Sequence, residues 1–199
     1  INIFFGTAVN AAQAISTQVS GQLGAFSGTM LRALNPVIAK SEGAGDRKLM
    51  LKASLTGNKF AFYLLILFLI PAMAEMSYLF KIWLKVVPEY AIIFCYLLLV
   101  RNLIEQLFYT LDSSIAAVGD IKSYQIINSV LNFLPLFVSY FFFKAGFDAQ
   151  AIYFIFICYS LAKSVVVLYF SKIKCGLSVG YYFREVIIPC VIVFVIVYF

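Results

Sequence analysis

Long apolar runs of about twenty residues recur along the chain, and they constrain its fold more than any other feature. A run of this length crosses the hydrocarbon core of a bilayer as a single α-helix. The other structure that can span a membrane is a closed β-barrel, whose strands need an alternation of apolar and polar residues. These runs lack that alternation. We therefore expect an all-α, polytopic transmembrane helix bundle.

Composition supports the same class of protein. Of 199 residues, 63% are hydrophobic and 12% are charged, whereas soluble domains carry about 25% charge. The chain begins at Ile1 without a methionine and ends within an apolar run, so we interpret it as a fragment of a longer protein. We treat residues 1–199 as a single bundle. Six spans are predicted, at about 7–32, 53–76, 88–117, 121–143, 148–171 and 181–199.

Basic residues in the connections between spans predict the orientation of the bundle. The first connection holds Lys40, Arg47, Lys48 and Lys52, and the third and fifth connections are basic too. Cytoplasmic loops carry such an excess of Lys and Arg, so we expect these three connections to be cytoplasmic. The net charge of +6 is dispersed among the connections. It indicates topology, and we expect the lipid bilayer as a partner but no nucleic acid.

Residue types that catalyse reactions or bind metals are scarce. The chain has no histidine, which removes the usual general base and all imidazole metal ligands. The four cysteines show no metal or disulfide spacing, and we interpret them as core residues. We expect no catalytic centre, no metal site and no cofactor, although a carboxylate-based enzyme stays open.

The first span is free of charge up to Leu31 and is nevertheless polar along one side. On a helical projection one small, polar face holds Asn10, Gln13, Thr17, Ser20, Gly24, Ser27 and Gly28. Two interpretations are open. The face packs against other helices, or it lines a substrate path in which amides and hydroxyls offer hydrogen bonds without buried charge.

The third span contains ionisable residues within the membrane. Arg101, Glu105 and Asp112 lie at offsets of four and eleven, which places them on nearly the same helix face. A charge at the bilayer centre costs about 2.5 to 3.5 kcal/mol, so these groups should face protein or water. One interpretation is a structural Arg101–Glu105 pair with Asp112 solvated near the helix end. The other is a functional site.

Two further polar features lie in the fourth and fifth spans. Tyr124, Asn128 and Asn132 repeat every four residues, which suits interhelical hydrogen bonding or substrate contact equally. For Lys163 we favour a side chain that snorkels to the inner surface. Prolines at 71, 135 and 189 predict kinks, and residues 80–85 predict a short interfacial helix.

Several segments resemble one family of transporters. They are FFGTAVNAA at 4–12, ALNP at 33–36, residues 40–46, IWL at 82–84 before Val87-Pro88, residues 116–125, and Leu134-Pro135. Together they resemble the multidrug/oligosaccharidyl-lipid/polysaccharide exporter superfamily, most closely the Wzx-type O-antigen flippases of its polysaccharide branch. In this family pattern the Asn35-Pro36 and 43–46 segments shape the first cytoplasmic turn.

The resemblance implies two similar helix bundles flanking a central cavity, as in MATE-like transporters, with this chain as mostly the C-terminal bundle. The missing N-terminal half would supply the other wall. Such flippases move an undecaprenyl-pyrophosphate-linked oligosaccharide, an O-antigen or capsule repeat unit, across the bacterial inner membrane by alternating access. Glycan polymerase machinery is then an expected partner.

The resemblance also implies roles for the polar residues. Arg101 and Lys163 are candidates for the pyrophosphate, and the amides and hydroxyls of the first span for the sugars. Glu105 and Asp112 are candidates for coupling to H⁺ or Na⁺, which keeps a cation-coupled multidrug exporter as the alternative. A polytopic enzyme of polysaccharide assembly is disfavoured because the longest loop, at 40–52, is short. A purely structural subunit does not predict polar faces on several spans.

Overall fold

The computed structural model describes residues 1–198, and every regular element in that range is helical. Five helical stretches are long and apolar enough to cross a membrane: α2 (Arg47–Ala74), α4 (Ala91–Val118), α5 (Lys122–Lys144), α6 (Ala151–Cys175) and the continuous stretch Val179–Tyr198. The predicted fold class is therefore confirmed, and the chain is a multi-pass membrane protein. The last stretch comprises α7 (Val179–Tyr182), the π-helix η1 (Phe183–Ile187) and α8 (Ile188–Tyr198).

The first predicted span corresponds to α1 (Asn2–Gly43), which is longer than predicted and is not among the five apolar stretches. The prediction that Asn35-Pro36 forms the cytoplasmic turn is wrong, because α1 continues through Pro36 for another two turns. An interior proline removes one backbone hydrogen bond but does not have to end a helix. The turn lies at 44–46, where Gly45 has a φ of 77° and Asp46 caps α2 by accepting from the Leu49 N–H at 3.0 Å.

Two shorter elements follow local sequence signals. The short helix predicted at 80–85 is α3 (Met76–Trp83), which begins four residues and ends two residues earlier than predicted. It buries Met76 and Phe80 against the bundle. The π-helical turn η1 ends just before Pro189, at a predicted kink site. Because proline has no N–H to donate, the regular hydrogen-bond pattern is interrupted there.

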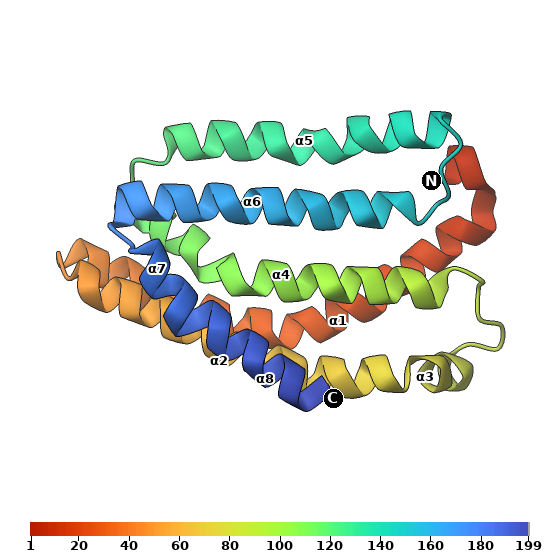
Figure 1. The fold of residues 1–199 in the computed structure, drawn as a ribbon, viewed down its shortest axis with the longest axis horizontal. Coiled ribbons are helices and arrows are strands. Elements are labelled where there is room, and N and C mark those ends of the chain that lie inside the picture. Colours follow the sequence, from red (N-terminus) through yellow and green to blue (C-terminus); the bar gives the residue numbers. More distant parts are fainter. Residues whose placement is uncertain (199) are drawn as a thin grey trace.

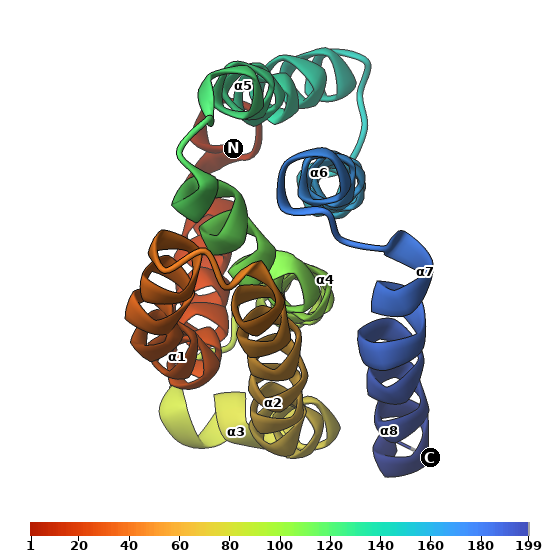
Figure 2. The same cartoon turned by 90° about the vertical axis from the view of Figure 1, so that its left-hand side faces the viewer.

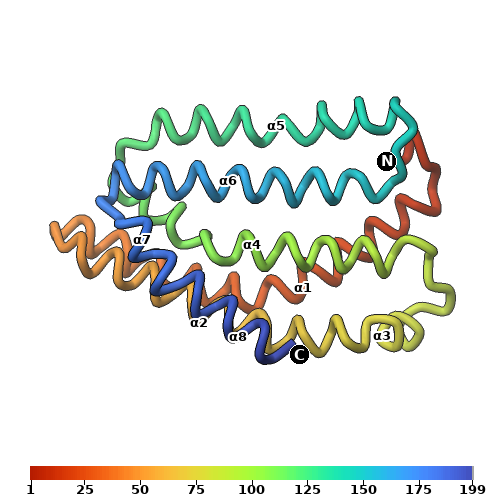
Figure 3. Tube along the Cα trace, viewed as in Figure 1, coloured from red at the N-terminus to blue at the C-terminus, as the bar shows by residue number. Residues whose placement is uncertain are grey.

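α1, α2 and α4 form a packed group, and two further helices, α6 and then α5, pack outside it. α1, α2 and α4 pack on one another, α6 packs on α4, and α5 packs on α6 at the edge of the bundle (Figures 1 and 2). The connections after α1, α4 and α6 lie at one end of the molecule, and those after α3 and α5 lie at the other (Figures 1 and 3). We call the first of these the basic end. At this end an ion pair joins Lys174, in the last turn of α6, to Asp120, in the connection between α4 and α5.

The apolar core has two parts. One, nearer the basic end, includes Ile38, Met50 and Leu111, and the other includes Leu65, Phe94 and Tyr153. Three cysteines are buried as expected, but Cys158 is exposed on α6, so the core interpretation is wrong for that residue. α5 contributes little to the core: its buried residues are Tyr124, Pro135, Ser139 and Phe143. Much of the surface of α5 is therefore not packed against the other helices.

Candidate functional site

A pocket of about 350 Å³ lies between α4, α5 and α6, and we call it the central pocket. Four of its lining residues are charged, and all four are ionisable residues identified in the sequence. Its lining residues are Arg101, Glu105, Phe108, Tyr109, Asp112, Asn132, Tyr159, Ser160, Lys163, Ser164 and Val167. The structure thus brings five of the ten predicted site residues, Arg101, Glu105, Asp112, Asn132 and Lys163, into one place.

The first charged pair in the pocket is formed within α4. Arg101 Nε donates to Glu105 Oε1 at 2.8 Å, one helical turn away, as the spacing predicts. Ser160 of α6 donates to the same carboxylate oxygen at 2.9 Å. The guanidinium of Arg101 also lies 5.0 Å from the ring centroid of Phe156, within range of a cation–π interaction. Arg101 is therefore oriented by both α4 and α6.

The second charged pair joins two helices. Lys163 Nζ on α6 lies 3.4 Å from Asp112 Oδ2 on α4, and Tyr124 of α5 donates to the other carboxylate oxygen. The snorkelling interpretation of Lys163 did not include this pair: an acid on the neighbouring helix gives the ammonium a partner inside the bundle. Asp112 is likewise held by α5 and α6, not simply solvated.

The central pocket is consequently rich in charge but formally neutral. Each of its two cations has one carboxylate partner in this conformation. Uncharged groups complete the wall, including the Tyr159 hydroxyl, which donates to the Asn132 side-chain oxygen. An anion can bind here by replacing a carboxylate as the partner of a cation.

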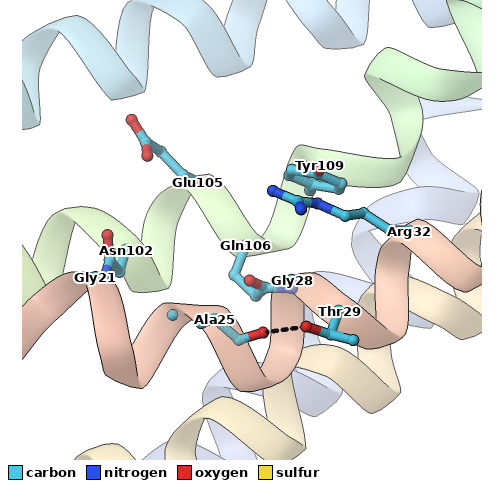
Figure 4. Close-up of a pocket in the computed structure, with 10 residues that line it drawn as sticks. Gly21, Ala25, Gly28, Thr29, Arg32, Asn102, Glu105, Gln106 and Tyr109 are labelled. Atoms are coloured by element: carbon cyan, nitrogen blue, oxygen red, sulfur yellow. Dashed lines mark hydrogen bonds between the residues drawn. The ribbon is translucent and has the colours of Figure 1, made fainter.

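α4 changes direction between its two acidic residues. Figure 1 shows the bend, and in Figure 4 the ribbon turns near Tyr109. The Thr110 N–H donates to the Asn58 side-chain oxygen of α2 at 3.1 Å, and the Tyr182 hydroxyl of α7 donates to the Leu107 carbonyl. Side chains from two other helices thus satisfy backbone groups at the bend, which is how irregular helices persist inside membrane bundles.

A second pocket, of about 340 Å³, lies between α1 and α4, and we call it the α1 pocket (Figure 4). Glu105 and Tyr109 line both pockets, so the two spaces adjoin across α4. In Figure 4 the Glu105 side chain points away from α1 toward α6, while Arg32 and Tyr109 lie together at one end of the pocket. A Cβ on Gly28 would meet no atom within 4 Å, which leaves this stretch of α1 open.

The polar face of α1 divides between packing and exposure. Ser20 Oγ accepts from Asn102 Nδ2 at 2.9 Å, and Ser27 donates to Gln106 Oε1 at 3.0 Å, so these hydroxyls pack against α4. Asn10 and Thr17 are exposed and Gln13 is half-buried; none of the three lines the two pockets described above. The packing interpretation therefore holds for Ser20.

Asn128 is a further predicted site residue that lies apart from the two pockets. Asn128 of α5 is half-buried and does not line the central pocket. Its side-chain oxygen is buried and has no hydrogen-bond partner among residues 1–198. The predicted stripe on α5 thus contributes Tyr124 and Asn132 to polar contacts but leaves Asn128 unsatisfied.

Several site residues were missed in the sequence. Tyr159 and Ser160 contribute a hydroxyl each to the central pocket, and Arg32 lines the α1 pocket. A signal for two of them exists, because Tyr159 and Ser160 precede Lys163 and Ser164 by one helical turn and so extend the polar face of α6. No comparable pattern pointed to Arg32.

Comparison of the chain with protein-family models, curated proteins and solved structures finds no match. Within residues 1–198 no cluster of three or more Cys, Asp or Glu side chains could hold a metal ion. Function therefore has to be inferred from the chemistry of the pockets.

Proposed function

We propose that the protein translocates an undecaprenyl-pyrophosphate-linked oligosaccharide across the bacterial inner membrane by alternating access, without making or breaking covalent bonds. In this proposal it belongs to the polysaccharide branch of the exporter superfamily that its sequence resembles. The chain would form one wall of the path, and an N-terminal bundle would form the other. The observation that carries the proposal is the pair of cations in the central pocket.

The central pocket offers what a lipid-linked pyrophosphate and its first sugars need. Phosphate oxygens are bound most strongly by charge-assisted hydrogen bonds, which Arg101 and Lys163 can supply. Asn132, Tyr159 and Ser164 add amide and hydroxyl groups of the kind that bind sugars. The lining thus combines the two chemistries of such a substrate.

The two acids give the proposal a mechanism. In the present conformation Glu105 and Asp112 neutralise the cations, and the substrate phosphates would replace them as partners. The cations then have an anionic partner before, during and after transport, which limits the cost of keeping charge inside the membrane. The bend in α4 lies between the two pairs, so a change in that bend would alter the spacing of the two cation sites.

Reconstitution of the full-length transporter tests the proposal. Proteoliposomes carrying a fluorescent undecaprenyl-pyrophosphate-linked oligosaccharide report flipping as accessibility of the label to a membrane-impermeant quencher. Arg101→Ala and Lys163→Ala should each reduce the flipping rate at least tenfold, since each removes a charge-assisted contact. Lys81→Ala, outside the pocket on α3, is the matched control. Wild-type rates in both pocket variants would overturn the assignment.

A cation-coupled multidrug exporter is the second candidate, favoured by two carboxylates in one pocket. That function makes the acids essential and the cations secondary. Glu105→Gln and Asp112→Asn would then abolish H⁺- or Na⁺-driven drug efflux, while Arg101→Ala and Lys163→Ala would preserve it. Neighbouring genes also discriminate, because glycosyltransferases and a polymerase favour the flippase, and a drug-responsive regulator favours the exporter.

A further inference from the structure

A third pocket, of about 590 Å³, lies at the basic end between α2 and the segment that connects α6 to η1. We call it the lysine pocket, because Lys48, Lys52 and Lys59 of α2 line it; Glu185 of η1 is its one acidic lining residue. It shares no residue with the central pocket. We infer that the lysine pocket binds the phosphate headgroup of an acidic phospholipid.

The helical repeat of α2 places the three lysines on one face of the helix. They lie at offsets of four and eleven residues, which places them within about 40° of one another on the helix circumference. Lys48 and Lys52 are exposed and have no ion-pair partner among residues 1–198. Lys59 is half-buried, with Nζ 3.6 Å from Glu185 Oε2. An excess of unpaired positive charge therefore faces the pocket.

This charge balance distinguishes the lysine pocket from the central one. In the central pocket each cation has a carboxylate partner, so an anion must displace an acid. In the lysine pocket, Lys48 and Lys52 have, within the described part of the chain, no carboxylate partner that an anion would have to displace. A phosphate group can bind directly, and Glu185 alone opposes it.

The remaining walls indicate a lipid and not a soluble phosphate. The lining also includes three leucines, Leu51, Leu55 and Leu177, and three residues with hydroxyl groups, Thr56, Ser178 and Tyr181. Basic pockets of this kind at the cytoplasmic side of membrane helices suit acidic headgroups, whose glycerol and acyl chains continue onto apolar surface. Lys48 and Lys52 are one turn apart, about 6 Å along the axis. A headgroup with two phosphates, as in cardiolipin, can contact both turns, so we expect cardiolipin to bind more tightly than phosphatidylglycerol.

Native mass spectrometry of the chain purified in detergent tests the inference by titration with cardiolipin, phosphatidylglycerol and phosphatidylcholine. The double variant Lys48→Gln/Lys52→Gln should weaken cardiolipin binding about tenfold or more, because each lysine near the surface contributes about a fivefold factor. The matched control Lys81→Gln/Lys85→Gln removes the same charge at the opposite end and should leave the affinity unchanged. Glu185→Gln should strengthen binding a few-fold. The inference is independent of the proposed transport activity.

Three outcomes would overturn the inference. Equal weakening in both double variants would mean that cardiolipin responds only to net charge. Equal binding of phosphatidylcholine would mean that the headgroup is not recognised. Displacement of cardiolipin by micromolar inorganic pyrophosphate would assign the pocket to a soluble phosphate ligand. Circular dichroism verifies the fold of each variant, and if the double variant is misfolded, Lys48→Gln alone, with an expected fivefold loss, decides the matter.

Discussion

α4 meets two of its neighbours, α2 and α6, through different chemistry. Toward α2 it presents Thr110 and Ser114, which are fully buried and hydrogen-bonded to Ser54 and Asn58. Toward α6 it presents Arg101, Glu105 and Asp112 around a pocket of about 350 Å³. Both faces are polar, yet one is closed and the other is hollow.

The difference shows what kind of polar residue indicates a cavity in a membrane bundle. Hydroxyl and amide groups can satisfy one another across a helix contact, so their burial costs little and the helices approach closely. Charged groups cost more to bury even when paired, and they stay where water or a ligand can reach them. A polar stripe alone therefore predicts a helix contact as readily as a path.

The largest expected effect is on the buried contact between α4 and α2. Asn58→Leu removes the acceptor of the Thr110 N–H, which is buried at the bend of α4. An unsatisfied buried donor costs about 1 to 3 kcal/mol. Removal of the Asn58 amide nitrogen, which is buried without a partner among the described residues, offsets part of this cost, so the variant should lose about 1 kcal/mol or more. Unfolding of the chain in mixed detergent micelles, followed by circular dichroism, measures the loss. A variant as stable as the wild type would show that the bend does not depend on α2.

A smaller effect is expected on the open side. The Arg101 and Glu105 side chains are 27% and 38% exposed, so solvent screens their attraction. A double-mutant cycle with Arg101→Gln and Glu105→Gln should give a coupling energy of about 0.5 to 1 kcal/mol in the same unfolding assay. Coupling of about 3 kcal/mol or more would indicate a pocket without water. The two faces of α4 would then not differ in their access to water.

The sequence predicted the elements of this fold well and their contacts only in part. Apolar run length and basic connections predict the long helices and the shared end of three connections, because both signals are local. The Arg101–Glu105 pair was predictable for the same reason. The Lys163–Asp112 pair was not, since it depends on the distance between α4 and α6, which the sequence does not contain.

One error of prediction concerns the end of α1. Pro36 did not end α1, because a proline in a helix interior removes only one backbone bond. The close approach of α1 to α2 accompanies this longer helix: a Cβ on Gly57 would lie 2.3 Å from Leu34 Cδ1. No signal within either segment alone reveals that contact.

Asn128 provides an intermediate case, an uncharged polar group that lacks a partner. Its side-chain oxygen is buried and unsatisfied among the described residues, so Asn128→Leu should leave stability unchanged or raise it by up to about 1 kcal/mol. The same unfolding assay, run beside Asn58→Leu as the matched amide replacement, measures the difference. A loss as large as that of Asn58→Leu would mean that Asn128 has a hydrogen-bond partner in the folded chain.

The smallest effect concerns a charged pair outside the membrane spans, between Glu42 and Arg47 beside the first turn. The hydrogen bond from Arg47 holds the pKa of Glu42 below its ordinary value of 4.5. A lowered pKa in the folded state means that the pair stabilises the fold above pH 4.5 and that this contribution disappears as the pH falls through the lowered pKa.

Glu42→Gln should therefore be slightly less stable than the wild type at pH 7 and equal to it in strong acid. Because the Arg47 side chain is 47% exposed, solvent screens its attraction to the half-buried Glu42, and the difference should be smaller than the coupling within the central pocket. Unfolding of both proteins at pH 7 and pH 3 measures it. A difference that persists unchanged at pH 3 would mean that Glu42 stabilises the fold through packing and not through its charge.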